Sequence, residues 1–392
     1  MINIDTQKKF VESRDISCEH SPYVQKRVSI LGSRGIPARH GGFETFAEQI
    51  SLYLVKNGWT VTVYCQNNSG KELFEEMWNG VRLIHIPVGC SDTVGSIIFD
   101  LKSTFHVMRE KSLVFTLGYN TAIFSFCYRI FGITNLINMD GFEWRRKKWS
   151  LLQKCWLYLN ERIACKVANH LIADHPEIKK HLQTRVKASK ISMIPYGVDV
   201  IENCDVSVLR KFGLQQNCFA LVVARPEPEN SVLEIIQAYS SKKRGYNLVI
   251  VGSHDPRNYP YHAKLSLSAG DEVIFLGTVY DKNILNSLRR FCRLYIHGHQ
   301  VGGTNPSLLE AMSAGNAILA HDNPFNRWVA GDSAVYFKDQ SECSTALDSL
   351  IDNSEKLQKL GSNALKICKE KFVSEKVMSA YNDLLCAWLA KK

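Results

Sequence analysis

The sequence predicts an α/β protein built from two doubly wound parallel sheets, one in each half of the chain. Short apolar runs alternate with longer segments of helical periodicity, which is the order of elements in a parallel sheet with crossover helices. The alternation pauses at residues 194–198 (Ile-Pro-Tyr-Gly-Val) and then begins again. A chain of 392 residues is also long enough for two or three domains. We therefore expect two domains of this type with a cleft between them.

The first half opens with an apolar run, residues 28–31, which we expect to form a strand. A glycine-rich loop follows, and residues 43–57 then carry apolar side chains on one helical face. Residues 151–168 also have apolar side chains at helical spacing. Four more strands are expected in this half, at residues 60–64, 81–86, 113–116 and 136–139.

The second half repeats this rhythm. Strands are expected at residues 219–224, 247–251, 273–276, 294–296 and 317–320. Helices are expected at residues 231–239, 281–290 and 305–314, and from residue 341 the pattern is helical to the end.

These elements define the expected domains. Residues 1–26 are polar and aperiodic, and we expect a loose extension there. The first domain is expected to cover residues 27–197 and the second residues 198–372. Residues 373–392 are expected to form a C-terminal helix that returns to the first domain.

Charge and composition narrow the possible partners and the compartment. The formal net charge is +10, and +8 of it falls within residues 1–200. A basic half favours an anionic partner such as a phosphate or a lipid headgroup. No apolar stretch has the roughly 18 residues of a membrane span, and residues 1–26 do not resemble a secretory signal. The twelve cysteines form no Cys-x-x-Cys pair, which favours reduced thiols in a cytoplasmic protein.

A glycine-rich loop at residues 32–42 joins the first strand to the first helix. Gly41 and Gly42 come directly before the helix, whose free amide groups and partial positive charge suit a phosphate. Arg34, Arg39 and His40 add donors in the same loop. The spacing is not that of the dinucleotide fingerprint Gly-x-Gly-x-x-Gly, so we expect a phosphate loop of another kind. A plain strand-to-helix connection is the alternative.

An acidic residue, Asp140, closes the strand at residues 136–139. The carboxyl end of a parallel strand faces the ligand cleft, where a carboxylate can accept a proton or orient a hydroxyl. The alternative is a turn-forming Asp-Gly pair.

A basic and aromatic cluster follows, Arg145–Lys148 between Trp144 and Trp149. Cationic and aromatic side chains together suit the surface of an anionic membrane, although a solvated basic face is an equal alternative. Nucleic acid is not expected as a partner, because the chain has no known binding motif for it.

Two loops of the second half also suit phosphate chemistry. Arg225 follows the strand at residues 219–224, where a guanidinium can reach a phosphate, unless it forms only a surface salt bridge. The other loop carries Gly302, Gly303, Thr304 and Asn305 in front of a helix that Pro306 opens.

Glu310 lies one turn into the helix that Pro306 opens. Its carboxylate can bind a ribose diol or simply interact with the helix dipole. No metal site is expected, because the chain has no Asp-x-Asp pair and no close set of His or Cys ligands. Arginine and helix N-termini would then balance a pyrophosphate instead of Mg²⁺.

Three motifs resemble the family-4 retaining glycosyltransferases, which have the GT-B fold of two Rossmann-like domains: residues 194–199, the loop that begins at Arg225, and residues 305–315. Three further segments resemble one branch of that family, the bacterial (β-1,4-)rhamnosyltransferases of surface polysaccharide assembly: residues 32–46, 140–150 and 301–306. The resemblance covers about residues 27–385.

The resemblance implies a nucleotide-sugar donor bound mainly by the second domain, with no cofactor and no metal. It implies that Arg225 binds the diphosphate, that Glu310 binds the ribose, and that Asp140 orients or assists the acceptor. The catalytic residues that it implies are Asp140, Arg225 and Glu310. The donor-binding residues are Gly41, Gly42, Arg225, Gly302, Gly303, Thr304, Asn305 and Glu310.

The chain departs from the broader family at three positions. Gly302 stands in place of the first Glu of a Glu-x7-Glu motif, Asn230 in place of a frequent Lys, and Trp328 in place of a frequent Glu. These positions concern the donor sugar, whereas Arg225 is retained.

The resemblance implies a hexosyltransferase that moves L-rhamnose from dTDP-rhamnose, with retention, onto an undecaprenyl-diphosphate-linked sugar. The product would serve capsule, O-antigen or exopolysaccharide synthesis, with the protein peripherally attached to the inner face of the cytoplasmic membrane. Two alternatives are a nucleotide-sugar epimerase and a non-catalytic nucleotide-sugar-binding protein. The missing fingerprint disfavours a dinucleotide oxidoreductase.

Overall fold

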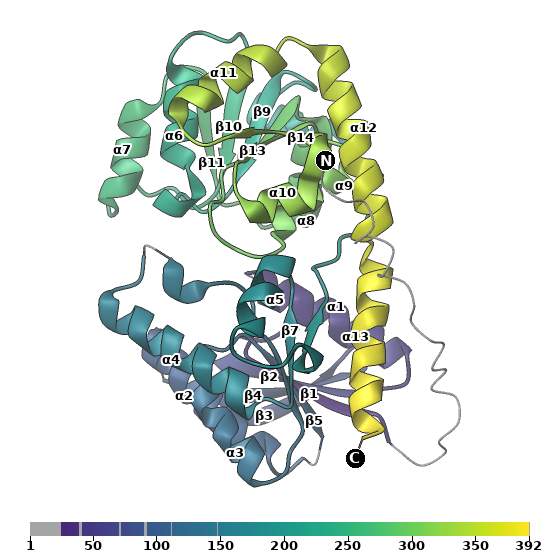
Figure 1. Cartoon of the computed structure of the whole chain (residues 1–392). Helices are drawn as coiled ribbons and strands as arrows, with labels where there is room; N and C mark the ends of the chain where they lie inside the picture. Colours follow the sequence, from purple (N-terminus) through teal and green to yellow (C-terminus); the bar gives the residue numbers. More distant parts are fainter. Residues whose placement is uncertain are drawn as a thin grey trace.

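The computed structural model describes residues 25–38, 41–69, 72–89, 92–110, 112–146 and 148–391. The chain forms two α/β domains, which lie one above the other in Figure 1. Each domain has one central sheet with helices packed on it. The predicted fold of two doubly wound domains is therefore confirmed. Residues 1–24, which make up most of the expected N-terminal extension, lie outside the described residues.

The first domain contains an eight-stranded sheet of order β3-β4-β2-β1-β5-β6-β7-β8. Its strands are β1 (Arg27–Leu31), β2 (Thr60–Asn67), β3 (Phe74–Trp78), β4 (Val81–Pro87), β5 (Leu113–Leu117), β6 (Asn135–Asn138), β7 (His170–Ala173) and β8 (Ile191–Met193). Its α-helices are α1 (Gly42–Lys56), α2 (Thr93–Val107), α3 (Ser125–Ile130), α4 (Leu151–Val167) and α5 (Pro176–Gln183). Short 3₁₀ turns η3 (Ala122–Phe124) and η4 (Glu143–Arg145) precede α3 and α4.

Three strands of this sheet are missing from the sequence prediction. The edge strand β3 pairs antiparallel with β4, whereas all the other neighbours are parallel. β3 is mostly exposed and includes Glu75 and Glu76, so it lacks the apolar pattern of a buried strand. A salt bridge of 2.8 Å between Glu75 and Arg82 joins it to β4. Strands β7 and β8 have only four and three residues, too few for a clear pattern.

The second domain contains a six-stranded parallel sheet of order β11-β10-β9-β12-β13-β14. Its strands are β9 (Phe219–Val223), β10 (Asn247–Val251), β11 (Val273–Gly277), β12 (Leu294–His297), β13 (Ile318–His321) and β14 (Ala334–Phe337). The helices of the second half are α6 (Val232–Ser240), α7 (Pro260–Ser268), α8 (Lys282–Phe291), α9 (Pro306–Ser313), α10 (Pro324–Ala330), α11 (Gln340–Leu350), α12 (Ser354–Lys371) and α13 (Ser374–Leu389).

In both sheets the strand order reverses beside the first strand of the domain. β1 lies between β2 and β5, and β9 lies between β10 and β12. Open parallel sheets bind ligands at the carboxyl ends of the strands near such a reversal. The loops after β6 and β12 contact each other across the gap between the domains, at Gly141 and Gly302. The carboxyl ends of both sheets therefore face the same gap.

The last two helices run along one side of the molecule, α12 beside the second domain and α13 beside the first (Figure 1). Where they meet, Val198 forms a parallel β-bridge with Val373, and the Val198 amide donates to the carbonyl of Phe372 at 2.8 Å. On the first domain, the indole N–H of Trp59 donates to the Asn382 side chain at 2.9 Å. The chain thus crosses between the domains twice at one place, which ties the end of the chain to the first domain.

None of the helices in the described ranges combines the length and the apolar character that crossing a bilayer requires. The ten cysteines in these ranges form no disulfide bonds with one another.

The packing of α13 leads to a stability prediction for Tyr381. Its ring is buried, with its centroid 4.9 Å from that of Phe46 and 5.7 Å from that of Phe115. We expect Tyr381→Ala to lower the free energy of unfolding by about 3–5 kcal/mol, as for other aromatic truncations in cores. Tyr381→Phe removes only the hydrogen bond from Asn138 and should cost about 1 kcal/mol. Denaturant unfolding of both variants checks this, and equal losses would contradict it.

Candidate functional site

The two domains touch where two glycine-containing turns meet. A Cβ atom on Gly141 would lie 3.4 Å from the carbonyl carbon of Gly302 and 3.6 Å from the amide nitrogen of Gly303. Beside this contact, a Cβ atom on Gly42 would lie 3.9 Å from the Cγ atom of Pro306. The N-termini of α1 and α9 are therefore neighbours across the gap. Two helix N-termini that open on one space favour an anionic ligand there.

Asp140 lies in the turn that makes this contact. Its backbone has φ +46°, a conformation that costs free energy for residues other than glycine and is frequent at functional sites. The Asn138 side chain accepts the Asp140 amide at 3.0 Å, and the Tyr119 hydroxyl donates to the Gly141 carbonyl at 3.0 Å. These two bonds fix the turn, so that the carboxyl group is presented at the end of β6.

The Asp140 carboxyl group is not an ordinary surface acid. Burial, and then the negative charge of Glu143, raise its pKa to about 7. Glu143 itself is paired with the Arg146 guanidinium at 2.6 Å. An acid with a pKa near 7 can both hold and release a proton at neutral pH.

A second carboxyl group, that of Asp174, directly follows the neighbouring strand β7, and it is not among the site residues predicted from the sequence. Its side chain is buried, and its Oδ2 accepts the backbone amide of Thr304 at 2.9 Å. The Thr304 hydroxyl donates to the Asp174 carbonyl. Oδ1 has no hydrogen-bond partner among the described residues. Burial, and then the charge of Asp140, raise the pKa of Asp174 well above its ordinary value.

Asp174 occupies a backbone amide of the loop before α9 that a ligand would otherwise bind. The Thr304 amide was expected to face the donor, but here it is bound to a carboxylate of the other domain. A Cβ on Gly303 would lie 2.2 Å from both Asp174 oxygens, so only glycine permits this approach. The amide is therefore available to a ligand only after Asp174 releases it.

Arg225 lies after β9, with a side chain that is 61% exposed and 3.6 Å from the carboxylate of Glu227. Burial lowers the pKa of Lys148, and the charge of Arg225 lowers it further. Burial likewise lowers the pKa of His299 to about 3, with Arg146 and Arg225 as the next causes. Since Lys148 and Arg146 belong to the first domain, the Arg225 guanidinium lies on the side that faces the first domain.

The expected basic cluster at residues 145–148 is therefore divided. Arg145 lies over the Phe142 and Trp144 rings, at 4.4 and 5.0 Å from their centroids. Arg146 and Lys148 contribute positive charge beside Arg225, and Lys147 lies outside the described residues. Part of this cluster thus belongs to the interdomain site and is not an outward-facing patch.

The expected ribose ligand, Glu310, lies on α9 and is 28% exposed. Its carboxylate is paired with the guanidinium of Arg289, which is buried on α8. Asn305 caps α9, since its side chain accepts the Ser307 amide at 2.9 Å. Glu310 is therefore held in place, whereas Asn305 has a structural task at the start of the helix.

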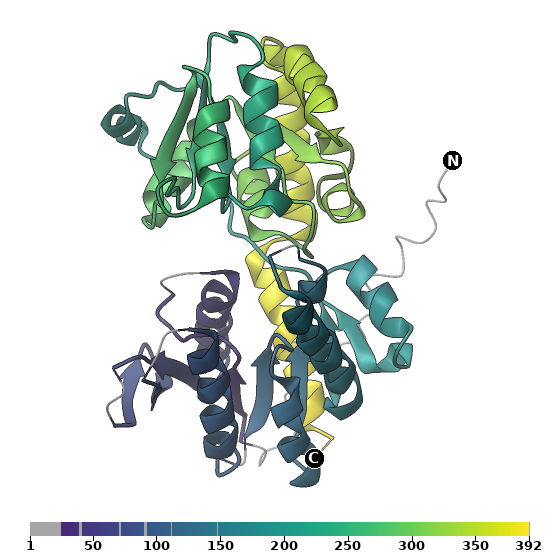
Figure 2. The ribbon, with the colours of Figure 1, turned by 90° about the vertical axis from the view of Figure 1, so that its left-hand side faces the viewer.

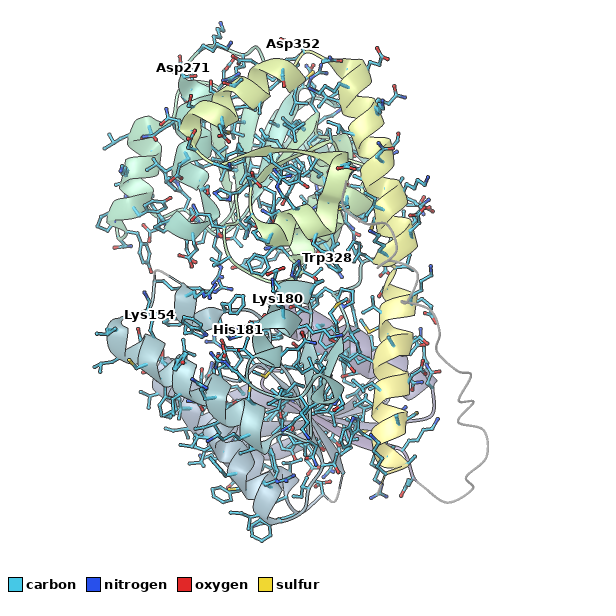
Figure 3. The ribbon with its side chains drawn as sticks, in the orientation of Figure 1. Lys154, Lys180, His181, Asp271, Trp328 and Asp352 are labelled. Atoms are coloured by element: carbon cyan, nitrogen blue, oxygen red, sulfur yellow. The ribbon has the colours of Figure 1, made fainter. Side chains whose placement is uncertain are left out.

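The three departures from the broader family have structural roles. Asn230 is buried and its side-chain amide donates to the Arg225 carbonyl at 2.8 Å, which shapes the Arg225 loop. Trp328 packs edge-on against His175 of the first domain, with ring centroids 4.8 Å apart. Figure 3 shows Trp328 across the gap from Lys180 on α5. Gly302 has φ +151° and gives the close contact with Gly141.

Two histidines lie at and just beyond the end of β12. The rings of His297 and His299 stack with centroids 4.3 Å apart. Burial lowers the pKa of both, so neither carries a charge at neutral pH. In the described part of the chain, no group of three or more His, Cys, Asp or Glu side chains is arranged to hold a metal ion.

Comparisons with known proteins cover both domains. Residues 25–199 match a family described as a domain of unknown function, DUF1972. Residues 210–367 match the family "Glycosyl transferases group 1". An uncharacterized glycosyltransferase, MJ1069 of Methanocaldococcus jannaschii, is 25% identical in an alignment 379 residues long, and the match covers 88% of this chain and 94% of that protein.

Solved structures of glycosyltransferases share the whole fold. Sucrose-phosphate synthase of Thermosynechococcus elongatus superposes with a TM-score of 0.80 at 15% identity, over 94% of this chain and all of that one. HepE of Anabaena, in complex with UDP and glucose, has a TM-score of 0.73 at 14% identity, over 93% of this chain and all of that one. The arrangement of the two domains is therefore that of the GT-B fold.

The raised pKa of Asp140 predicts a pH-dependent stability difference. A raised acid pKa means that the protonated carboxyl stabilises the fold fully below about pH 4, and that this contribution is lost as the pH rises to about 7. The neutral amide introduced by Asp140→Asn mimics the protonated carboxyl, so this variant should have a higher Tm than the native protein at pH 8 and a similar Tm near pH 4. Thermal unfolding across this range checks it. A Tm difference that is independent of pH would contradict it.

The bond between Asp174 and Thr304 predicts a local exchange effect. Asp174→Ala should speed hydrogen exchange of the Thr304 amide about fivefold, because an ordinary buried hydrogen bond is worth about 1 kcal/mol. The Ser307 amide, which Asn305 holds in the same loop, is the internal control. Unchanged exchange at Thr304 would show that Asp174 does not hold the loop in solution.

Proposed function

We propose that this chain, a glycosyltransferase of the GT-B fold with a group 1 domain at residues 210–367, transfers L-rhamnose from dTDP-rhamnose. The acceptor is a hydroxyl group of an undecaprenyl-diphosphate-linked sugar in bacterial surface polysaccharide synthesis. The sugar keeps its anomeric configuration. The sequence resemblance of residues 32–46, 140–150 and 301–306 to the rhamnosyltransferase branch supports the sugar and the acceptor.

One observation carries the assignment of the reacting centre. The Asp140 turn of the first domain touches the Gly302 loop of the second domain, and Arg225 lies on the same side. A donor bound by the second domain would therefore have its sugar next to a first-domain acid. HepE has been solved with UDP-glucose, which supports a nucleoside-diphosphate sugar as the class of donor.

The diphosphate of the donor needs positive charge, and the chain supplies it from three sources. The N-termini of α1, with Gly41 and Gly42, and of α9 provide partial positive charge and amide donors. Arg225 provides a full charge that can move to the ligand, because its side chain is mostly exposed. In this proposal these groups bind the diphosphate without a metal ion, and Glu310 binds the ribose.

The reaction breaks the bond between C1 of the sugar and the phosphate oxygen, and forms a bond from C1 to the acceptor oxygen. Arg225 and the helix N-termini stabilise the negative charge that develops on the leaving diphosphate. The proton of the acceptor hydroxyl passes to the leaving phosphate oxygen. Asp140 orients that hydroxyl through a hydrogen bond. Because its pKa is about 7, the carboxyl group can either donate or accept this bond at neutral pH.

Transfer of labelled rhamnose tests the proposal directly. The purified chain with dTDP-rhamnose and a short-chain polyprenyl-diphosphate-sugar acceptor should give a rhamnosylated product with the β configuration of the donor, which NMR identifies. Conversion of the donor without an acceptor would instead indicate an epimerase. Binding without conversion would indicate a nucleotide-sugar-binding protein.

The role of Arg225 predicts the effect of its loss. Arg225→Ala should lower kcat by about 10²–10³-fold, as for other groups that stabilise transition-state charge. Arg257→Ala removes an exposed arginine from the same domain and should leave kcat unchanged. If Arg225→Ala keeps turnover within about threefold of the native protein, the guanidinium does not assist the leaving group.

A further inference from the structure

Three helices of the first domain, α2, α3 and α4, form one side of the molecule. The segment between β5 and α3 links them, since the Thr121 hydroxyl donates to Asp100 of α2 at 2.7 Å and the Ile123 amide donates to Asn160 of α4 at 2.9 Å. Figure 1 shows the three helices on the left-hand side of the lower domain, and Figure 2 looks onto that side. We call their solvent-exposed side chains the α2–α4 face.

The α2–α4 face is unusually apolar. Eleven of the eighteen large hydrophobic side chains that are exposed in the described part of the chain lie on it. Leu152 is 83% exposed, Ile130 76% and Phe131 66%. On α4, Leu152, Trp156 and Leu159 follow one another at helical spacing, opposite the buried Leu157. So many exposed apolar side chains on one side of a protein indicate a surface that contacts something other than water.

The charges on this face all have one sign. Lys102, Arg129, Arg162 and Lys166 are exposed on the three helices. The acidic residues of these helices are turned away from solvent, because Asp100 accepts the Thr121 hydroxyl and Glu161 is buried against His181 and the indole N–H of Trp144. Among the described residues of the three helices, the face therefore combines exposed apolar side chains with exposed cations and has no exposed acid.

We propose that the α2–α4 face is the surface by which the protein docks on a bilayer that contains anionic lipids. Apolar and aromatic side chains enter the interfacial region, while the Lys and Arg side chains reach the negative headgroups. A second copy of the chain fits less well, because a twofold contact of this face would bring like charges together. Because the proposed function includes a lipid-linked acceptor, the docking surface rests on that function.

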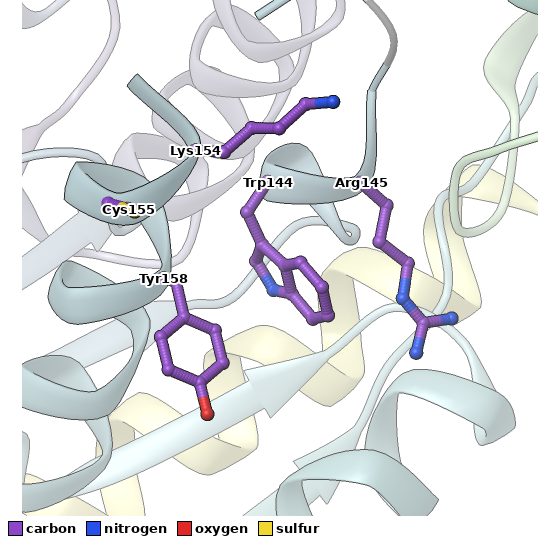
Figure 4. A pocket seen from close by; sticks show the side chains of 5 residues that line it. All are labelled: Trp144, Arg145, Lys154, Cys155 and Tyr158. Atoms are coloured by element: carbon purple, nitrogen blue, oxygen red, sulfur yellow. The ribbon is translucent and has the colours of Figure 1, made fainter. Parts of the chain in front are cut away.

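The end of this face leads to the candidate site. A surface recess of about 580 Å³ lies at the N-terminal end of α4, lined by Trp144, Arg145, Lys154, Cys155 and Tyr158 (Figure 4). Figure 3 places Lys154 beside the gap between the domains. The turn η4, which contains Trp144 and Arg145, follows the Asp140 turn directly. A lipid diphosphate from the docked bilayer could thus lie between Arg145 and Lys154, with its sugar toward Asp140.

Vesicle cosedimentation of the full chain tests the docking surface. We expect binding to phosphatidylcholine vesicles with about 30% phosphatidylglycerol, and at least about tenfold weaker binding to phosphatidylcholine alone. The double variant Ile130→Ser/Phe131→Ser and the charge variant Arg129→Glu/Arg162→Glu should each weaken binding about tenfold or more. Leu267→Ser and Arg257→Glu, which change exposed residues of the second domain, are the matched controls and should bind like the native chain.

Two further measurements separate the possible failures. Rhamnosyl transfer to a short-chain, water-soluble acceptor should be unchanged in the α2–α4 face variants. If the native chain binds vesicles but transfers no rhamnose, the proposed function is wrong and the docking surface is not. Circular dichroism and the Tm of each variant establish that it is folded. Native-like vesicle binding by folded face variants, or no binding by the native chain, would overturn the docking surface. A concentration-dependent dimer that Ile130→Ser/Phe131→Ser abolishes, without vesicle binding, would also overturn it.

Discussion

The close approach of two backbone turns across the interdomain gap is the constraint on which the rest of the site depends. Gly141 and Gly302 touch without side chains between them, and Gly303 leaves room for the Asp174 carboxylate. This carboxylate then binds the Thr304 amide of the other domain. As a result the acid at the end of β6 and the Arg225 loop share one space.

Acidic and positively charged groups occupy different parts of this space, and this separation suits a group transfer. The first domain contributes two carboxyl groups whose pKa values are raised by burial, together with cations such as Arg146. The second domain contributes Arg225 and the N-terminus of α9. Two stacked histidines stay neutral beside them. An anionic leaving group would meet the positive elements, while a hydroxyl acceptor would meet an acid that can still carry its proton.

Most regular elements could be predicted from the sequence, but the short or exposed strands β3, β7 and β8 could not, and neither could contacts between distant segments. The helix expected at residues 43–57 is observed at Gly42–Lys56, because its apolar spacing is clear. Asp174 has no local signal beyond its place after a short apolar strand, and its partner Thr304 is 130 residues away. The α2–α4 face was missed for another reason. The segment 151–168 carries apolar residues on both its buried and its exposed side, and spacing alone cannot tell which side faces the core.

The structure of the chain with dTDP-rhamnose or dTDP bound tests the central claim most directly. The account predicts a diphosphate about 3 Å from the Arg225 guanidinium, between the N-termini of α1 and α9, with the ribose at Glu310 and the sugar facing Asp140. A nucleotide bound outside the interdomain gap, or a diphosphate that Arg225 does not contact, would contradict it.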